Sequence, residues 1–224
     1  MISGLIFDMD GVIFDTEKML AHFWNKAALE FGYDMNISHS IAIRSTAPKK
    51  AEEILKGFFG DEFDYYAVRE RRRKLMNEYI EKNGLPVKDG VFKILKMAKK
   101  NNLKTSIATA TDIERTKWYL EKENLTDYFD TVSTTQMVER GKPYPDIYQY
   151  ACMSIGLSPL RCAAFEDSDN GIKSACNAGC KVFVIPDLTQ PDDEIKKMAF
   201  RVENNLSKAS DYIENVILKS ERMN

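Results

Sequence analysis

Short apolar runs alternate with stretches of helical periodicity along most of the 224-residue chain. This alternation is typical of β-α units and predicts an α/β fold built on a parallel sheet. The strands that the apolar runs predict are residues 4–7, 105–109, 131–134, 162–165 and 181–185. A helix is expected over 113–123, directly after the second strand.

Residues 17–84 depart from this alternation, because they contain no convincing strand. Apolar residues there recur at helical spacing, first in 20–31, then after Pro48 and again in 61–82. We therefore predict a small α-helical cap domain, 17–84, inserted into a core formed by 1–16 and 85–224. The alternative is one domain with an unusually long crossover, although a β-α crossover normally needs only one helix.

Composition narrows the range of partners. A formal net charge of -2 gives no overall field that would favour nucleic acid or a membrane surface. The N-terminus shows no signal-peptide pattern, and no apolar run approaches the roughly 20 residues of a membrane span. We expect a cytoplasmic protein whose four cysteines (Cys152, Cys162, Cys176 and Cys180) are reduced core thiols.

Histidine content excludes several kinds of catalytic site. Only His22 and His39 occur, so a histidine-rich zinc site, an H-E-x-x-H helix and a Ser-His-Asp triad all lack their parts. Neither histidine has a candidate ligand at i+4, and both are interpreted as surface or packing residues.

Two carboxylates stand where the first predicted strand breaks into a glycine turn, in F-D-M-D-G-V. Acids at such a position are costly unless they bind a cation or react. An EF-hand is excluded, because Gly11 comes fourth in the loop and an oxygen ligand is missing at position five. We interpret Asp8 as a nucleophile and Asp10 as its acid/base partner, with simple capping of the next helix as the alternative.

Two further motifs offer groups for an anion. The second strand ends in Thr109-Ala110-Thr111-Asp112 before a helix, where backbone N–H groups and the helix dipole attract a phosphate. The alternative is that Thr111 and Glu114 form a capping box. Lys142, in G-K-P-Y-P-D, is held between a glycine and two prolines, which restrict the chain and fix the ammonium group.

A fourth motif, F-E-D-S-D-N-G, again ends an apolar strand in two acids. Two acidic strand ends in one parallel sheet converge at its carboxyl edge and suit Mg²⁺, with Asp8, Asp10, Glu166 and Asp167 as candidate ligands. In the mechanism that these motifs favour, Asp8 attacks phosphorus to form an aspartyl phosphate, and Asp10 transfers protons. Thr109, Ala110 and Lys142 are the candidate phosphate-binding residues.

Together, the four motifs resemble those of the haloacid dehalogenase superfamily, in the same order. The helical insert after the first motif is similar to that of the subgroup of β-phosphoglucomutase and sugar-phosphate phosphatases. The resemblance implies a Rossmann-like parallel sheet with a helical cap that closes over the substrate. It also implies that Mg²⁺ is held by Asp8, the Asp10 carbonyl and Asp167, with Glu166 beside them.

The resemblance leaves three chemistries to compare. Dehalogenases of the superfamily lack the second acid and use no Mg²⁺, so Asp10 and the acidic pair favour phosphoryl transfer. Similar mutases carry a cap histidine in a T-x-x-x-H context, but Leu20 stands at that position and His22 lies roughly 200° further round the helix. The prediction is a Mg²⁺-dependent phosphatase of a small phosphorylated metabolite, a sugar phosphate above all, with the mutase and a non-catalytic binding module as alternatives.

Cap residues are expected to select the substrate, because the core binds the phosphoryl group. Arg44 matches a cap loop that reads G-R-S in relatives, although Ala42 and Ile43 precede it here. The basic run 69–74 places Arg69, Arg72 and Arg73 on one side of a helix, which favours a solvated face, with attraction of an anionic substrate as the alternative. We expect a monomer.

Overall fold

A computed structural model describes residues 2–218, and its core is a six-stranded parallel sheet in the order β3-β2-β1-β4-β5-β6. The strands are β1 (Gly4–Phe7), β2 (Lys104–Thr109), β3 (Thr131–Thr134), β4 (Cys162–Glu166), β5 (Lys181–Val184) and β6 (Arg201–Val202). The predicted α/β class is confirmed, and the five predicted strands agree with the structure to within one residue at each end. The strand β6 was not predicted, because its two residues are exposed and carry no apolar pattern.

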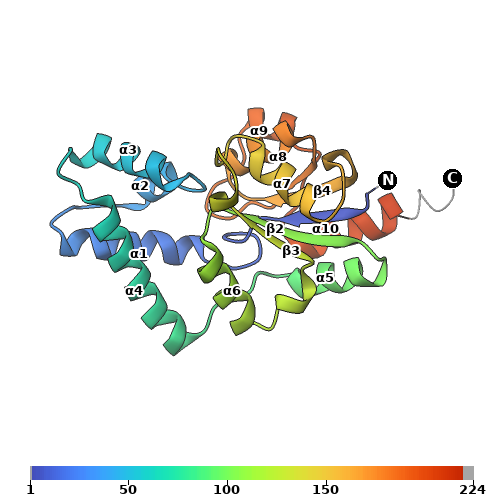
Figure 1. Cartoon of the computed structure of the whole chain (residues 1–224), viewed down its shortest axis with the longest axis horizontal. Coiled ribbons are helices and arrows are strands. Elements are labelled where there is room, and N and C mark those ends of the chain that lie inside the picture. The colour runs from blue at the N-terminus through green and yellow to red at the C-terminus, as the bar shows by residue number, and fades with distance from the viewer. Residues whose placement is uncertain (1, 219–224) are drawn as a thin grey trace.

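Helices of the core cover both faces of this sheet (Figure 1). They are α5 (Val91–Lys100), α6 (Ile113–Lys122), α7 (Asp146–Ser154), α8 (Asp169–Ala178), α9 (Asp193–Met198) and α10 (Leu206–Tyr212). Short helical turns are η1 (Thr126–Tyr128), η2 (Thr135–Met137), η3 (Pro159–Arg161) and η4 (Ile213–Leu218).

The central strand β1 shows why the sheet needs cover on both sides. Leu5 and Phe7 belong to the apolar cluster shared with α5 and α10, whereas Ile6 belongs to the cluster shared with α7 and α8. The ring of Phe7 stacks on that of Phe165 in β4 at 4.7 Å, and Phe165 stacks on Phe183 in β5 at 5.4 Å. A strand that is buried on both faces therefore has a continuous run of apolar residues in its sequence.

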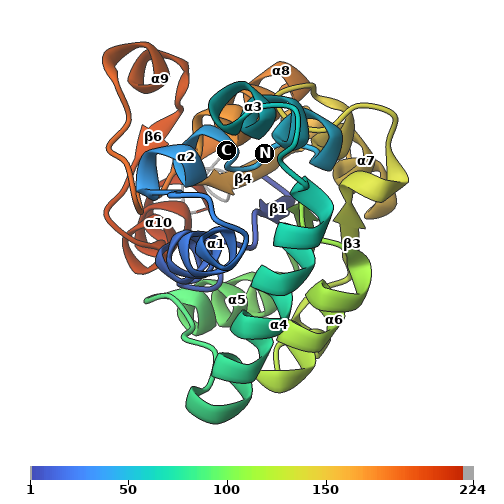
Figure 2. The same ribbon diagram turned by 90° about the vertical axis from the view of Figure 1, so that its left-hand side faces the viewer.

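Four helices lie between β1 and α5, to one side of the sheet in Figure 1. They are α1 (Glu17–Glu30), α2 (Ile37–Ala42), α3 (Pro48–Phe59) and α4 (Tyr65–Asn83). The helices α1 and α4 pack side by side (Figure 2). Between them, the Trp24 ring is stacked on that of Tyr65 at 5.7 Å. All three predicted helical stretches are present, and the division into cap and core at residues 17 and 84 stays a proposal.

The short helix α2 was not predicted. It is only six residues long, and local hydrogen bonds at its start hold it in place. The Asn36 side chain accepts from the Ser38 N–H at 3.0 Å, and the Asn36 N–H donates to His39 Nδ1 at 3.0 Å. Such a capping box stabilises a helix too short for an amphipathic pattern.

Two composition-based expectations can be compared with the structure. All four cysteines are free thiols, and three of them are buried. Within residues 2–218, we find no helix with the length and apolar character needed to cross a membrane.

Candidate active site

The first acidic residue follows β1 directly and is bound to the neighbouring strand. The Asp8 N–H donates to the Phe165 carbonyl of β4 at 3.0 Å, which extends the parallel pairing past the end of β1. The chain then turns at Gly11, where φ is +85°. A Cβ at Gly11 would lie 2.1 Å from Asp167 Oδ2, so glycine lets the turn approach the fourth motif.

Lys142 joins the first and fourth motifs. Its Nζ donates to Asp8 Oδ1 at 2.7 Å and also to Glu166 Oε1, and its side chain is fully buried. Burial disfavours the ammonium form, but the Asp8 and Glu166 carboxylates outweigh this effect and raise the pKa of Lys142. Lys142 is therefore a fixed positive charge between two acids.

The carboxylate of Asp8 is affected by burial in the opposite direction. The pKa of Asp8 is raised to about 7, first by desolvation and also by the negative charge of Glu166, while Lys142 opposes this rise. A fixed cation beside this carboxylate favours the ionised form that a nucleophile requires.

Protein donors occupy both oxygens of Glu166. Oε1 accepts from the Tyr148 hydroxyl at 2.8 Å as well as from Lys142. Oε2 accepts from the Asp167 N–H at 3.1 Å, the Ser168 N–H at 3.3 Å and the Ser168 hydroxyl at 3.2 Å. The predicted metal ligand Glu166 is thus held in place by these donors, and sequence reasoning missed Tyr148 among them.

Asp167 has the opposite character, because both of its carboxylate oxygens are buried without a hydrogen-bond partner. Arg44 Nη1 is 3.8 Å from Oδ2, and Arg44 Nη2 donates to the Asp167 carbonyl at 2.9 Å. One oxygen each from Asp8, Glu166 and Asp167 lies within 4.8 Å of the others. Buried, unpartnered oxygen donors fit a hard divalent cation such as Mg²⁺.

The acids of this site make stability depend on pH. Burial raises the pKa of Asp8 to about 7 and that of Glu17 to about 8, and burial also raises that of Asp167. The folded chain therefore binds more protons than the unfolded chain. The stabilisation is complete below the ordinary pKa of these acids, near about 4, and is lost as the pH rises through about 7 to 8.

We therefore expect the EDTA-treated protein to melt at a higher temperature at pH 5.5 than at pH 8.5. Mg²⁺ should reduce this difference, because protons compete with the ion at pH 5.5 but no longer do so at pH 8.5. At 100 times its Kd, the ion adds about 2.7 kcal/mol, or roughly 5–10 °C in Tm. Thermal melts with Ca²⁺ and with NaCl at equal ionic strength are the controls, and a Mg²⁺ effect that is equal at both pH values would contradict the assignment.

Two threonine hydroxyls hold the second acid, Asp10. The Thr16 hydroxyl donates to Oδ1 at 2.5 Å, and the Thr111 hydroxyl donates to Oδ2 at 2.7 Å. Thr16 is the last residue before the predicted cap, and Thr111 follows β2, so two segments that are distant in the sequence meet at Asp10. Sequence reasoning missed both threonines as partners of Asp10.

The turn after β2 lines the same site. Thr109 is buried and accepts from the Thr111 N–H at 3.1 Å, and both Thr109 and Ala110 face the cavity described next. The alternative of a capping box at Thr111 is wrong, because Asp112 caps α6 by accepting from the Arg115 N–H at 3.0 Å. Because the N-cap residue is Asp112, the Thr111 hydroxyl is free to donate to Asp10.

A cavity of about 120 Å³ lies between helices α1 to α4 and the core. Its lining includes Asp8 and Asp10 from the core, and Leu20, Glu17 and Arg44 from the predicted cap. Arg44 is buried and also donates to the Thr189 hydroxyl at 2.9 Å, so this loop is bound to the core beside Asp167. These contacts hold the Arg44 loop against the core at the edge of the cavity.

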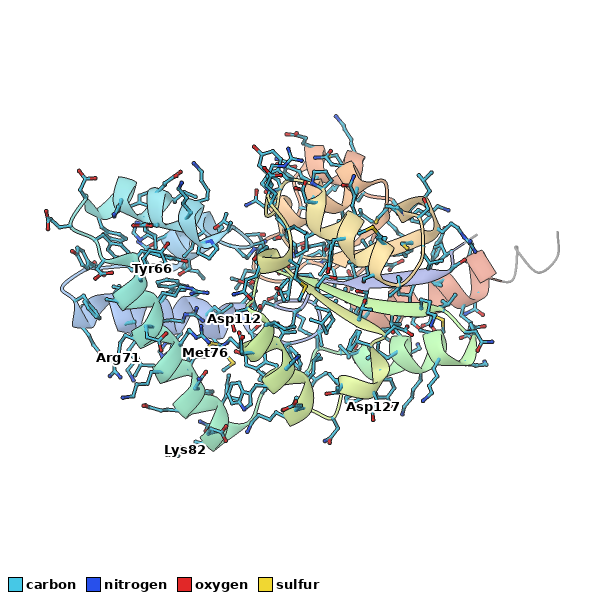
Figure 3. All side chains as sticks on the ribbon, viewed as in Figure 1. Tyr66, Arg71, Met76, Lys82, Asp112 and Asp127 are labelled. Carbon is cyan, nitrogen blue, oxygen red and sulfur yellow. The ribbon has the colours of Figure 1, made fainter. Side chains whose placement is uncertain are left out.

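The favoured interpretation of the basic run 69–74, a uniform solvated face, is wrong. Arg69, Arg72 and Arg73 all line the cavity, and Arg72 is buried. The fourth arginine of the run, Arg71, lies on the outer side of α4, where it pairs with Glu30 (Figure 3). The helical spacing thus places three arginines on the side of the cavity.

Comparison with known proteins identifies the family. Residues 5–185 match the haloacid dehalogenase-like hydrolase family. The chain belongs to this family. YhcW of Bacillus subtilis, provisionally named a phosphatase, is 32% identical over 187 residues, which cover 83% of this chain and 84% of that protein.

Two further relatives of this haloacid dehalogenase-like hydrolase are informative. The phosphorylated carbohydrates phosphatase of Thermotoga maritima is 27% identical over 182 residues, covering 80% of this chain and 82% of that protein. The solved β-phosphoglucomutase of Clostridium difficile has a TM-score of 0.83 at 21% identity and covers 99% of this chain and 100% of its own. At that identity, the structural match supports the fold alone, and it agrees with the predicted Rossmann-like core.

Proposed function

We propose that this hydrolase is a Mg²⁺-dependent phosphatase that acts on a small phosphorylated carbohydrate through an aspartyl-phosphate intermediate. The contrast between its two leading acids carries the proposal. The Asp8 carboxylate is paired with the buried ammonium group of Lys142, whereas two threonine hydroxyls orient the Asp10 carboxylate, and both acids line the cavity. The names of YhcW and of the Thermotoga maritima phosphatase support the same reaction class.

In the first step, a carboxylate oxygen of Asp8 attacks phosphorus, and a P–O bond forms while the ester P–O bond breaks. Asp10 donates a proton to the departing sugar oxygen. In the second step, Asp10 accepts a proton from water as the water oxygen attacks phosphorus, which releases inorganic phosphate and regenerates the Asp8 carboxylate. The hydroxyls of Thr16 and Thr111 keep the Asp10 carboxyl aimed into the cavity.

Charge neutralisation is the second requirement of this chemistry. Asp8, the Asp10 carbonyl and Asp167 would hold Mg²⁺, with Glu166 beside them, and the bound ion would neutralise charge on the phosphoryl oxygens. Lys142 supplies a fixed positive charge from the protein. Thr109 and the Ala110 N–H are assigned to the remaining phosphoryl oxygens, at the start of α6.

The runner-up function, a phosphosugar mutase, would need a group in the cap that controls proton transfer by Asp10. Leu20 lines the cavity at the position of the histidine expected for a mutase. His22 is exposed, and its ring contacts Phe23 at 4.9 Å. These positions favour water over a sugar hydroxyl as the final acceptor.

A screen of sugar, polyol and nucleotide monophosphates with Mg²⁺ tests the proposal. We expect inorganic phosphate to be released fastest from sugar phosphates. Conversion of a hexose 1-phosphate to its 6-phosphate faster than phosphate appears would support the mutase instead. A small phosphorylated metabolite remains the proposed partner, and a monomeric, cytoplasmic enzyme remains the expectation.

A further inference from the structure

Four arginines gather on the wall of the cavity formed by α4 and α6. They are Arg69, Arg72 and Arg73 from α4 and Arg115 from α6. Asp112 is the acid that pairs with members of this group, with Arg73 Nη1 at 3.1 Å and Arg69 Nη2 at 4.0 Å from its Oδ2. On this wall, four guanidinium groups thus accompany one carboxylate, which leaves an excess of positive charge; the other acids of the lining are Asp8, Asp10 and Glu17.

Arg72 and Arg115 are the two buried members, with 7% and 6% of their surface exposed. Within residues 2–218, neither guanidinium forms an ion pair with a carboxylate, and two of their polar atoms, Arg72 Nε and Arg115 Nη2, have no hydrogen-bond partner. Buried N–H groups normally find acceptors, and an unpaired donor on a charged group is especially costly.

The remaining contacts hold both guanidinium groups in place. Arg72 lies 5.3 Å from the centre of the Trp24 ring, and its Nη1 lies 3.9 Å from Met76 Sδ. Arg115 donates through Nε to the Tyr119 hydroxyl at 2.8 Å and through Nη1 to Asn77 Oδ1 at 2.8 Å. Both guanidinium groups are therefore oriented before any ligand arrives.

Met76 shows that the two arginines are neighbours. Its Sδ lies 3.9 Å from Arg72 Nη1 and 3.9 Å from the Tyr119 hydroxyl, which itself accepts from Arg115. Figure 3 labels Met76 on the side of α4 that faces Asp112 and α6. Burial and the positive charges of Arg115 and Arg69 lower the pKa of Arg72 to about 9, and a bound anion would relieve this repulsion.

We propose that Arg72 and Arg115 bind a second anionic group of the substrate, a phosphoryl or carboxylate group at the end remote from the scissile phosphate. The inference rests on the proposed phosphatase function and specifies its substrate class as a sugar bisphosphate or a phosphorylated sugar acid. Planar guanidinium groups suit both anions, because paired N–H donors match two oxygens. Arg69 and Arg73 extend the positively charged surface, and ion pairs with Asp112 hold both side chains at the edge of this surface.

Direct binding tests this inference without turnover. In an Asp8→Asn background with Mg²⁺, calorimetry compares fructose 1,6-bisphosphate with fructose 1-phosphate, and 6-phosphogluconate with glucose 6-phosphate. We expect the doubly anionic member of at least one pair to bind about tenfold more tightly or better, the fold-change of about one charge-assisted hydrogen-bond pair. The pair that shows the preference identifies the remote group as phosphoryl or carboxylate.

Arginine variants then locate the preference. Arg115→Gln and Arg72→Gln, each added to Asp8→Asn, should reduce it to below about threefold. Arg71→Gln is the matched control, since Arg71 lies on the same helix but pairs with Glu30 on the outer side. If a glutamine variant unfolds at a markedly lower temperature, Arg115→Lys replaces it in the comparison. This variant keeps the positive charge but removes the paired N–H donors, so it should lower the preference as well.

The outcomes separate this inference from the proposed function. Equal binding within both pairs, or a preference that survives both arginine substitutions, overturns the second anion site. Release of phosphate by the unmodified enzyme is measured separately on the monophosphates. Its absence would contradict the phosphatase, while the binding comparison would still decide the inference.

Discussion

Asp8→Asn is expected to lower phosphate release by at least about 10⁴-fold, because the substitution removes the atom that attacks phosphorus. Asparagine has the same shape, and its side-chain oxygen can still accept from Lys142, so the fold should persist. Phosphate release under saturating sugar phosphate and Mg²⁺, together with a thermal melt, measures both effects. The loss should appear in kcat, since an interaction of the reacting atoms is removed.

A matched control separates this loss from a general effect of removing a carboxylate. Asp127 lies in η1, is exposed, and is remote from the cavity (Figure 3). Asp127→Asn should keep phosphate release within about twofold, as surface substitutions usually do. Retained turnover in Asp8→Asn would remove Asp8 from the role of nucleophile.

Lys142→Met is expected to destabilise the metal-free protein by about 3–5 kcal/mol, because two buried carboxylates would lose their shared cation. The ammonium group lies 2.7 Å from Asp8 Oδ1 and also bonds to Glu166, and burial excludes water as a substitute. Urea unfolding in EDTA measures the change. Turnover should fall too, since Lys142 supplies fixed positive charge at the phosphoryl site.

Two further variants serve as controls for Lys142→Met. Lys117→Met removes an exposed ammonium group from α6 and should change stability by less than about 0.5 kcal/mol. Adding Glu166→Gln to Lys142→Met removes one unpaired charge and should recover part of the lost stability. If the double variant were less stable than Lys142→Met by the full cost of Glu166→Gln alone, the two side chains would not be coupled as their contact requires.

The pattern of apolar residues along the chain predicted the central sheet well. The runs that became β1, β2, β3, β4 and β5 are apolar because helices cover both faces of the sheet, and burial on both faces leaves a clear trace in sequence. The two residues of β6 and the six of α2 leave no such trace. Pairing at an edge and one capping box stabilise these elements, and both depend on neighbours that composition does not show.

The site was predictable where spacing alone brings residues together. Strand ends in a parallel sheet meet at one edge, so the convergence of Asp8 and Asp167 follows from topology. The hydrogen-bond partners of the other two acids, Asp10 and Glu166, do not follow from topology. Thr16, Thr111 and Tyr148 come from three other segments, and a single hydroxyl in a sequence carries no sign of the carboxylate it will meet.

The burial of side chains in the predicted cap could be predicted from the sequence even less well. Helical spacing predicted that Arg69, Arg72 and Arg73 share one side of α4, but not whether that side is solvated. Burial of Arg72 follows from the packing of α4 on α1 and from the approach of α6, which are long-range contacts. If the proposed function holds, substrate selection would depend on contacts between helices α1 to α4 and the core.

The covalent intermediate is the central claim, and trapping it on the protein tests that claim most directly. Excess enzyme is mixed with a sugar phosphate and Mg²⁺, quenched in acid within the first turnover and digested for mass mapping. The mechanism predicts one phosphoryl group on the peptide that contains Asp8, absent from Asp8→Asn and lost as free phosphate appears. Phosphate release within that turnover with no phosphoryl group on Asp8, or with the group on another residue, would contradict the mechanism.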